Sequence, residues 1–238
     1  MKYLLTELKY IYNGFFLKIN PSNEYKQFKR DGFLVKEKFL TKDQCHNFIT
    51  QIDLNIKNEK ISWKDEKGSD IRIFNFTSKT KIFKNENIDL DCFYRKYIST
   101  IECRKFIMAN KLVAKENNLG SGGGWHRDNL NRRQLKFMIY LNDVNEDNGA
   151  FQYIPKTHKV LSKVFTNSLS NNFRYSSDKI NKLYPKKSIK LSAKAGTLIV
   201  FDSSGLHRGS PILKGKRYAL TQYMFDSEIP LHIKKLFV

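Results

Sequence analysis

Residues Ala195–Ser210 read AGTLIVFDSSGLHRGS, and this stretch decides which fold the chain can adopt. Its first half is a short apolar run rich in β-branched and aromatic residues, which predicts a buried strand. Stretches of the same kind recur after about residue 110, with turn residues between them. They are KLVAKE (111–116), QLKFMIYLND (134–143), GAFQYIP (149–155), KSIKLSA (187–193) and RYALTQYMF (217–225). This succession predicts strands that close into a barrel or a sandwich.

The first third of the chain predicts helices. SNEYKQFKRDGF (22–33) has a capping residue at its start and Gly32 at its end, which is typical of one short helix. FLVKEKF (33–39) then alternates like a strand. Thr41 followed by Gln44 is a capping-box pattern, and Ser99 followed by Glu102 repeats it. Helices followed by a run of strands predict an α+β fold without βαβ units.

The length of 238 residues and a hydrophobic content of 40% suit one domain with a packed core over residues 1–238. Residues 1–27 predict a helical extension whose apolar face packs on the domain, with a membrane-surface anchor as the weaker alternative. No apolar run reaches the roughly 18 residues of a membrane span, and we expect no signal peptide. Cys45, Cys92 and Cys103 have no zinc spacing, which predicts reduced thiols in a cytoplasmic protein.

The charge is unevenly distributed. The chain carries 43 Lys and Arg against 23 Asp and Glu, a net charge of +20. Residues 151–200 hold ten basic side chains and one acidic side chain, Asp178. We interpret 156–194 as a basic insertion near the pocket mouth that recruits an anionic substrate. A lysine-rich composition without function is the alternative. A nucleic-acid partner is less favoured, because no binding motif accompanies the charge.

A His-x-Asp pair follows three glycines in GGGWHRDNL (122–130). Side chains two residues apart on an extended segment share a face, so His126 and Asp128 converge on one point. Taken alone, the pair is more readily explained as a structural hydrogen bond than as a metal site. Trp125 is interpreted as core or pocket wall, and Arg127 is expected to face solvent or a substrate anion.

His207 is the histidine best placed to complete a metal site, because it follows an apolar strand and a turn. Two histidines and one carboxylate on one face are typical of non-haem Fe(II) oxygenases. Ten residues later comes Arg217, at the start of the last strand. Its planar guanidinium suits a bound dicarboxylate cosubstrate. Arg208 is expected, like Arg127, to face solvent or substrate.

Four motifs in this order resemble the phytanoyl-CoA dioxygenase family of Fe(II)/2-oxoglutarate oxygenases. They are WHRD, YLNDVNEDNGAFQYIPKTHK, AGTLIVFDSSGLHRGS and KRYALTQY, preceded by FKRDGFLVKEKFLTKDQC of the family's usual type, and together they cover roughly residues 28–226. The resemblance implies a double-stranded β-helix, or jelly roll, with flanking helices.

The resemblance also implies roles for single residues. His126, Asp128 and His207 match the iron ligands, and Arg217 matches the arginine that holds the distal carboxylate of 2-oxoglutarate. Thr157 falls at a hydroxyl position of the family, although Lys156 replaces the usual glycine before it. Gly209 replaces a serine, with Ser210 one residue further on. Lys136 is the second expected cosubstrate contact.

We therefore predict a dioxygenase that uses Fe(II), 2-oxoglutarate and O2 and releases succinate and CO2. Because the carboxylate ligand Asp128 is present, hydroxylation is favoured over halogenation. The expected substrate is an anionic small molecule or a carrier- or lipid-linked sugar or acyl group. A jelly-roll binding protein with a non-catalytic metal site and a basic nucleic-acid-interacting protein are the alternatives.

Overall fold

The computed structural model describes residues 5, 8–12, 22–77, 80–83, 90–98, 104–128, 133–166, 173–225 and 228–237. Its strands are β1 (Phe33–Lys36), β2 (Trp63–Lys64), β3 (Asp70–Ile73), β4 (Arg104–Val113), β5 (Leu135–Tyr140), β6 (Phe151–Tyr153), β7 (Ile189–Leu191), β8 (Leu198–Asp202), β9 (His207–Gly209) and β10 (Lys216–Phe225). Its helices are α2 (Asn23–Asp31), α3 (Lys42–Asn55), η1 (Thr80–Phe83), α4 (Leu90–Ile98), α5 (Val160–Phe165), α6 (Ser177–Leu183) and α7 (Leu231–Lys234).

Two antiparallel sheets face each other. The large sheet has the order β1-β8-β5-β10-β4-β3-β2, and the small sheet has the order β7-β6-β9. The space between them is filled by alternate residues of facing strands, among them Met138 and Tyr140 of β5, Ala219 of β10 and Phe151 and Tyr153 of β6. This arrangement is a double-stranded β-helix, so the predicted α+β jelly-roll fold is confirmed.

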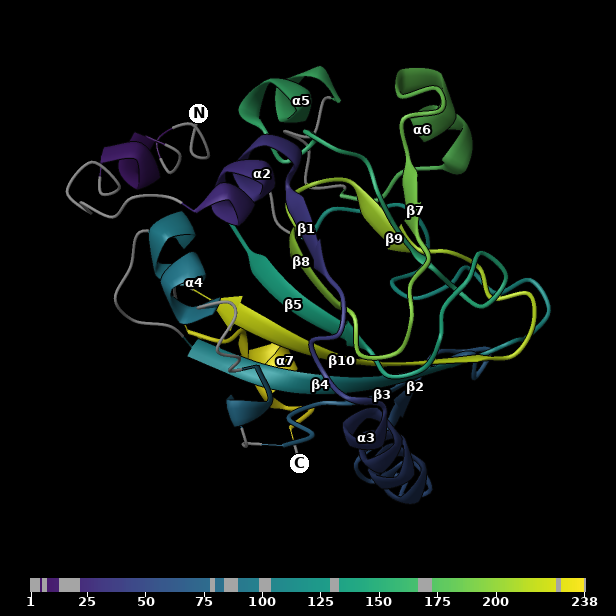
Figure 1. Ribbon diagram of the computed structural model, residues 1–238. Helices are drawn as coiled ribbons and strands as arrows, with labels where there is room; N and C mark the ends of the chain where they lie inside the picture. Colours follow the sequence, from purple (N-terminus) through teal and green to yellow (C-terminus); the bar gives the residue numbers. More distant parts are fainter. Residues whose placement is uncertain are drawn as a thin grey trace.

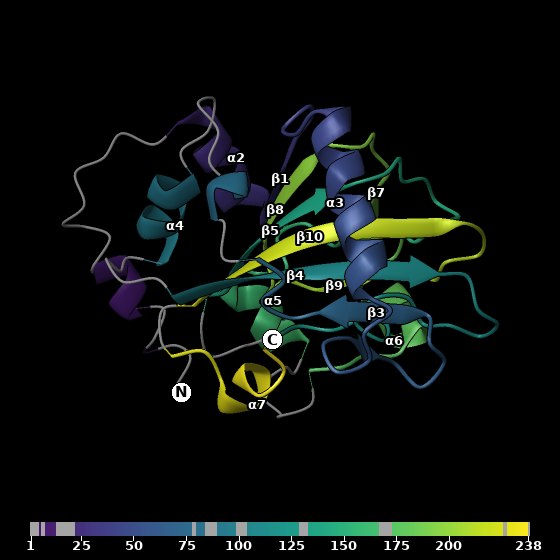
Figure 2. The same ribbon diagram turned by 90° about the horizontal axis from the view of Figure 1, so that it is seen from below.

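The outer face of the large sheet is covered by helices. The intervening residues of the same strands, such as Phe137, Ile139 and Leu220, join the main core with Phe28 of α2 and Ile52 of α3. Figure 1 shows α2 and α4 at one end of this sheet, and Figure 2 shows α3 lying across β3, β4 and β10. Because both of its faces are covered, all six residues of β5 are buried.

Local signals explain where the first helices begin and end. Ser22 caps α2 by accepting from the backbone N–H of Tyr25, and Gly32 ends it in the left-handed region at a φ of 88°. Thr41 and Gln44 form the predicted capping box at the start of α3. Gly32 then leads directly into β1, whose Phe33 pairs with Phe201 of β8.

Two expectations about the N-terminal third are wrong. Arg104–Ile107, which follow the predicted capping box, open strand β4 rather than a helix. The reason is tertiary: Phe106 stacks on Tyr223 of the paired strand β10, with ring centroids 4.8 Å apart. In the N-terminal extension, Leu8 and Ile11 are exposed and Tyr10 is buried instead. Ser99, Glu102, Cys103, Leu4 and Phe15 lie outside the described residues.

Two smaller predictions concern the membrane and the thiols. Among the described residues, no helix is both long and apolar enough to span a membrane. Cys45 of α3 is a free thiol buried in the core. Burial raises the pKa of this thiol, so it stays protonated and unreactive.

Candidate metal centre

Backbone pairing brings the His-x-Asp segment against the start of β9. His126 and His207 exchange two backbone hydrogen bonds of 3.0 Å each, and the N–H of Asp128 donates to the carbonyl of Ser203 at 2.9 Å. His126 lies in an isolated bridge rather than in the strand that its sequence predicts. The extended geometry still places His126 and Asp128 on one face, opposite His207.

The three side chains converge on one point. Nε2 of His126 lies 3.4 Å from Oδ1 of Asp128, and Nε2 of His207 lies 3.9 Å from the same oxygen. Nδ1 of His126 and of His207 donate to the carbonyls of Gly124 and Gly205, at 2.8 and 2.9 Å. Each imidazole therefore carries its proton on Nδ1 and turns the lone pair of Nε2 toward the common point, which is what a metal ligand requires.

The charges around this point favour a bound cation. Burial, followed by the charge of His126, lowers the pKa of His207 to about 3, so the imidazole is neutral at pH 7. Burial disfavours the charge of Asp128, but Lys136 and His126 outweigh it and hold the pKa of Asp128 well below its usual range. Lys136 forms an ion pair with Oδ2 of Asp128. Two imidazoles and one carboxylate on a single face suit Fe(II).

The glycines before the pair make room for the first ligand. Gly122 has a φ of 83°, and a Cβ there would lie 2.4 Å from Cε1 of His126. Gly122 also lines the cavity. Gly124 has a φ of 90° as well, but a Cβ there would meet no atom within 4 Å, so this glycine serves only the backbone turn.

The three side chains line a cavity of about 170 Å³ between the two sheets. The large sheet supplies a cationic and polar wall through β3, β4, β5, β8 and β10, the small sheet supplies residues of β6 and β9, and residues outside the strands supply the rest. The other lining residues are Arg72, Met108, Asn110, Ser121, Gly122, Lys136, Met138, Phe151, Arg174, Phe201, Gly209, Thr221 and Tyr223. Lys136 thus faces the metal centre, and Arg174 brings the basic insertion 156–194 to the cavity.

Arg217 lies one layer behind this wall. It is 2% exposed and faces the space between the sheets. Its guanidinium donates to the carbonyl of Gly149 at 2.5 Å and to Oδ1 of Asn110 at 3.1 Å. Nε has no partner, and no described carboxylate lies within ion-pairing distance. Burial lowers the pKa of Arg217, which shows how poorly its charge is compensated.

Thr157 and Ser210 do not line the cavity. Oγ1 of Thr157 donates to the carbonyl of Ile154 at 2.6 Å and accepts from the N–H of Leu206 at 2.8 Å. These bonds tie the loop after β6 to the residue before His207. Ser210 is buried, and its N–H donates to the carbonyl of Ala150 at 2.8 Å. Thr157 thus supports the chain around the metal centre, and neither side chain is among the described residues that line the cavity.

Arg127 does not face solvent, contrary to expectation. It is 2% exposed, and Nη1 donates to the carbonyls of Thr157 and Ser204 at 2.6 Å each. Nη2 donates to the hydroxyls of Ser162 and Thr166 at 3.3 and 3.4 Å. One side chain therefore joins the first ligand segment to the turn before His207 and to α5. No local pattern around WHRD distinguishes this role from a solvated arginine.

Arg208, which follows the other ligand histidine, has a different environment. It is half-buried, with its guanidinium 4.8 Å from the ring centre of the buried Trp125 and Nε donating to Oε1 of Gln152. Trp125 itself belongs to a small cluster with Ile154, Ile180 and Leu206, so its expected place in the core is confirmed.

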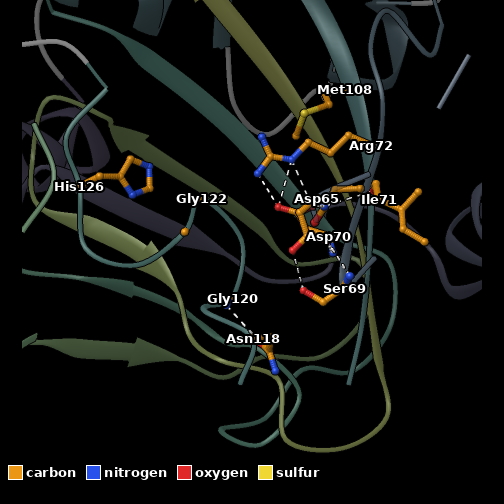
Figure 3. Close-up of polar contacts among 12 residues, drawn as sticks. Asp65, Ser69, Asp70, Ile71, Arg72, Met108, Asn118, Gly120, Gly122 and His126 are labelled. Carbon is orange, nitrogen blue, oxygen red and sulfur yellow. Dashed lines mark hydrogen bonds and ion pairs between the residues drawn. The ribbon is translucent and has the colours of Figure 1, made fainter. Parts of the chain in front are cut away.

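Arg72 and Asp70 are site residues that the sequence reasoning missed. Both lie on β3, two residues apart and hence on one face. Figure 3 shows the Arg72 guanidinium bound to Asp70 and directed toward the side where His126 and Gly122 lie. Although burial opposes it, Asp70 raises the pKa of Arg72, which stays charged. The Asp-x-Arg spacing on a short β-branched segment was the signal available.

Comparison with known proteins agrees with this geometry. The model of the family "Phytanoyl-CoA dioxygenase (PhyH)" matches residues 28–217. No curated protein matches the sequence.

Several solved structures share the fold. The epimerase SnoN, solved with Fe3+, α-ketoglutarate and nogalamycin RO, has a TM-score of 0.61 at 13% identity, covering 90% of this chain and 87% of that one. HygX from Streptomyces hygroscopicus, with nickel, 2-oxoglutarate and hygromycin B, has a TM-score of 0.60 at 13% identity, covering 86% and 87%. EvdO2 from Micromonospora carbonacea var. aurantiaca, with 2-oxoglutarate, has a TM-score of 0.60 at 12% identity, covering 89% and 94%.

The family model covers most of the chain and includes all three converging side chains and Arg217. The protein therefore belongs to the phytanoyl-CoA dioxygenase family, and it is a non-haem iron- and 2-oxoglutarate-dependent enzyme.

Proposed function

We propose that this enzyme hydroxylates an anionic small molecule and converts 2-oxoglutarate and O2 to succinate and CO2. One observation carries the proposal: His126, Asp128 and His207 converge on one point in a cavity where the other charged side chains among the described lining residues are all cations. We propose further that residues 1–238 form one catalytic domain, since both sheets share one interior. We also propose that this domain acts in the cytoplasm.

His126, Asp128 and His207 would hold Fe(II), with their Nε2 and carboxylate oxygen atoms as ligands. When bound, the metal supplies activation of O2, coupled to oxidative decarboxylation of the cosubstrate. Gly124 and Gly205 keep both imidazoles in the required tautomer through their carbonyls. The protein thereby fixes the three donors before the metal arrives.

Arg217 is the residue we assign to the distal carboxylate of 2-oxoglutarate. A buried guanidinium without a carboxylate partner is costly, because its desolvation is not repaid by an opposite charge. An incoming carboxylate would supply that charge and accept from the unpartnered edge of the guanidinium. Lys136, which already pairs with Asp128, provides a second cation on the same wall.

The substrate enters a basic surrounding. Arg174 of the insertion 156–194 lines the cavity, and Lys186 and Lys187 of the same insertion are exposed. Long-range attraction by such charges speeds the encounter with an anion and depends on ionic strength. Charge reversal at Lys186 and Lys187 is expected to raise KM for an anionic substrate at low salt, with little change in kcat.

The test is a titration of the metal-free protein with Co(II) and then 2-oxoglutarate, followed by visible absorption, together with succinate formation by the Fe(II)-loaded enzyme. We expect His207→Ala to abolish Co(II) binding, because two donors of this set remain. We expect Arg217→Met to keep Co(II) binding and to weaken 2-oxoglutarate binding. Failure of the wild-type protein to bind 2-oxoglutarate would refute the proposal.

The same assays separate the alternatives. A binding protein with a silent metal site would bind Co(II) and 2-oxoglutarate but form no succinate with any anionic metabolite offered. A nucleic-acid-interacting protein would bind oligonucleotides with a steep dependence on salt. A product heavier by one oxygen atom would establish hydroxylation, whereas an isomer of the substrate would place the enzyme with epimerases such as the neighbour SnoN.

A further inference from the structure

Helix α5 presents three apolar side chains to solvent. Leu161 is 80% exposed, Val164 51% and Phe165 64%. Leu161 and Phe165 stand four residues apart and so share one face of the helix, and both line a groove of about 720 Å³. Two exposed lysines, Lys156 and Lys187, line the same groove. Clustered apolar side chains at a surface mark a docking site, and the lysines around them indicate an anionic partner.

The N-terminal segment 8–12 exposes further apolar side chains at this end of the molecule. Leu8 and Ile11 face solvent instead of packing on the domain. The segment is held by the buried Tyr10, because the guanidinium of Arg133 lies 4.9 Å from the ring centre of Tyr10 and 4.9 Å from that of Tyr97 on α4. Figure 1 shows the segment next to α2, at the end of the molecule that also carries α5.

A basic groove lies between these two sets of apolar side chains. Its volume is about 730 Å³, and residues of α2, α4 and α5 line it. Tyr97, which contacts the arginine that holds the N-terminal segment, lines one part of it, and Leu161 of α5 lines another. Its described lining residues include no carboxylate and five side chains that carry a positive charge, Lys26, Lys29, Arg30, Arg133 and Lys159. The groove therefore attracts anionic groups.

The positive charge of this groove is only partly compensated. Arg30 pairs with Asp31, with Nη2 2.8 Å from Oδ2. Lys26, Lys29 and Lys159 are exposed and form no ion pair with any residue that the structure describes. The loop after β6 is tied to the end of α2 by a backbone hydrogen bond of 2.9 Å to the carbonyl of Asp31. The unpaired lysines of α2 and of this loop are thus held on one face.

Lysines among exposed apolar side chains match the surface of an anionic bilayer. The lysines meet lipid phosphates, and the apolar side chains enter the boundary between head groups and acyl chains. A nucleic acid offers phosphates but no apolar layer for Leu161 and Val164. A second copy that docked through the same face would bring lysines against lysines, because such an interface repeats the same surface on both subunits. Charge and polarity together favour a lipid surface.

We propose that the face formed by residues 8–12, α2 and α5 docks on bilayers that contain anionic phospholipids. The inference goes beyond the proposed function, because lipid binding requires neither the metal nor 2-oxoglutarate. Nη2 of Arg127, which follows the first ligand histidine, donates to the hydroxyl of Ser162 on α5 at 3.3 Å. A protein docked through α5 therefore carries its metal centre close to the bilayer.

Flotation of the full 238-residue protein with lipid vesicles tests this docking. One set of vesicles consists of phosphatidylcholine alone, and the other is an equal mixture of phosphatidylcholine and phosphatidylglycerol. We expect the protein to float with the mixed vesicles and to stay in solution with phosphatidylcholine alone. High salt should weaken binding to the mixed vesicles, because it screens the attraction between lysines and lipid phosphates.

A pair of charge variants tests the groove. Lys29→Gln/Lys159→Gln removes two of its unpaired lysines. A lysine near an anionic surface contributes about 1 kcal/mol, or roughly fivefold in the partition coefficient, so the double variant should bind at least tenfold more weakly. The matched control, Lys57→Gln/Lys60→Gln, removes the same net charge at two exposed lysines after α3 and should change binding less than about twofold.

A second pair of variants tests the apolar side chains. Leu161→Gln/Phe165→Gln keeps the charge and should lower the partition coefficient at least tenfold, because two apolar side chains no longer enter the bilayer. The matched control, Leu54→Gln, changes a leucine of α3 that is 64% exposed and lies far from α5 in Figure 1, and it should bind like wild type. All four variants should keep the melting temperature and the Co(II) affinity of the wild-type protein, which shows that they are folded.

The outcomes are distinct. No flotation of the wild-type protein with the mixed vesicles, or unchanged binding in either test variant, overturns the inference. An equal loss in the Lys57→Gln/Lys60→Gln control also overturns it, since the net charge of +20 would then act without this face. Binding of an oligonucleotide or of a second copy that Leu161→Gln/Phe165→Gln abolishes, in place of vesicle binding, assigns the face to that partner instead. If the wild-type protein floats as expected but fails to bind 2-oxoglutarate, the proposed function fails while the docking face stands.

Discussion

Replacing Arg127 with methionine tests whether one buried guanidinium holds the metal centre together. Methionine keeps much of the apolar volume but removes every hydrogen bond of the head group. The carbonyls of Thr157 and Ser204, each 2.6 Å from Nη1, then lose a charge-assisted donor. Each such bond is worth about 1.5–3 kcal/mol when its partner stays buried.

The desolvation of the cation offsets part of this loss. Arg127 is 2% exposed, and burial lowers its pKa, so removing the charge recovers some free energy. We expect a net destabilisation of about 2–4 kcal/mol, a large share of the roughly 5–15 kcal/mol of a typical domain. For a chain of this size the melting temperature should fall by roughly 4–16 °C.

The assay is urea denaturation of the metal-free protein, followed by Co(II) titration of the folded variant. Because Arg127 ties Ser204 to the segment that carries Asp128, Co(II) affinity should fall as well. The matched control is Arg208→Met, which changes the half-buried arginine after the other ligand histidine and should cost about 1 kcal/mol or less. If Arg127→Met is as stable as the wild-type protein, the desolvation cost of the cation cancels all four hydrogen bonds. That result would refute the predicted destabilisation.

Three further predictions address single contacts. Thr157→Val should lower the free energy of unfolding in urea by about 1–3 kcal/mol, because the buried backbone N–H of Leu206 loses its acceptor. A weaker affinity of this variant for 2-oxoglutarate would contradict the position of Thr157 outside the cavity. Gly122→Ala should lower Co(II) affinity at least tenfold through contact with His126, whereas Gly124→Ala, with similar backbone strain but no neighbour, should not. Burial lowers the pKa of His158 below the ordinary 6.5, so the folded state favours the neutral imidazole. The contribution of His158 to the free energy of unfolding is fully present above pH 6.5. It is lost as the pH falls toward the pKa of His158 in the folded protein. The stability difference between wild type and His158→Gln in urea should therefore shrink by up to about 1.4 kcal/mol per pH unit below 6.5, and a constant difference would refute this.

Short-range patterns predicted the parts of this protein that depend on neighbouring residues. Capping residues located the start of α2 and α3, and runs of β-branched and aromatic residues located β5, β8 and β10. The spacing of two residues placed His126 and Asp128 on one face, as the structure shows. The predicted helix after Ser99 failed at Arg104–Ile107, because pairing with β10 outweighs helix propensity there.

Burial of charged groups was beyond these patterns. Arg127 and Arg208 occupy equivalent places after ligand histidines, yet one is enclosed by two loops and a helix and the other lies half-exposed on Trp125. Arg72 is separated from His126 by 54 positions in the sequence, and its role depends on β3 joining the edge of β4. No periodicity within a segment encodes such a neighbour.

The sequence by itself determined the α+β character, the strands, and the identity of the three converging ligands, because each follows from alternation along one segment or from motifs in a known order. Tertiary structure alone decided that Arg217 lies behind Asn110, that Thr157 supports the loop before His207, and that Arg72 faces the metal cavity. The physical reason is that a strand's pattern tells which side chains share a face. Only the closing of two sheets around a common interior decides what that face meets.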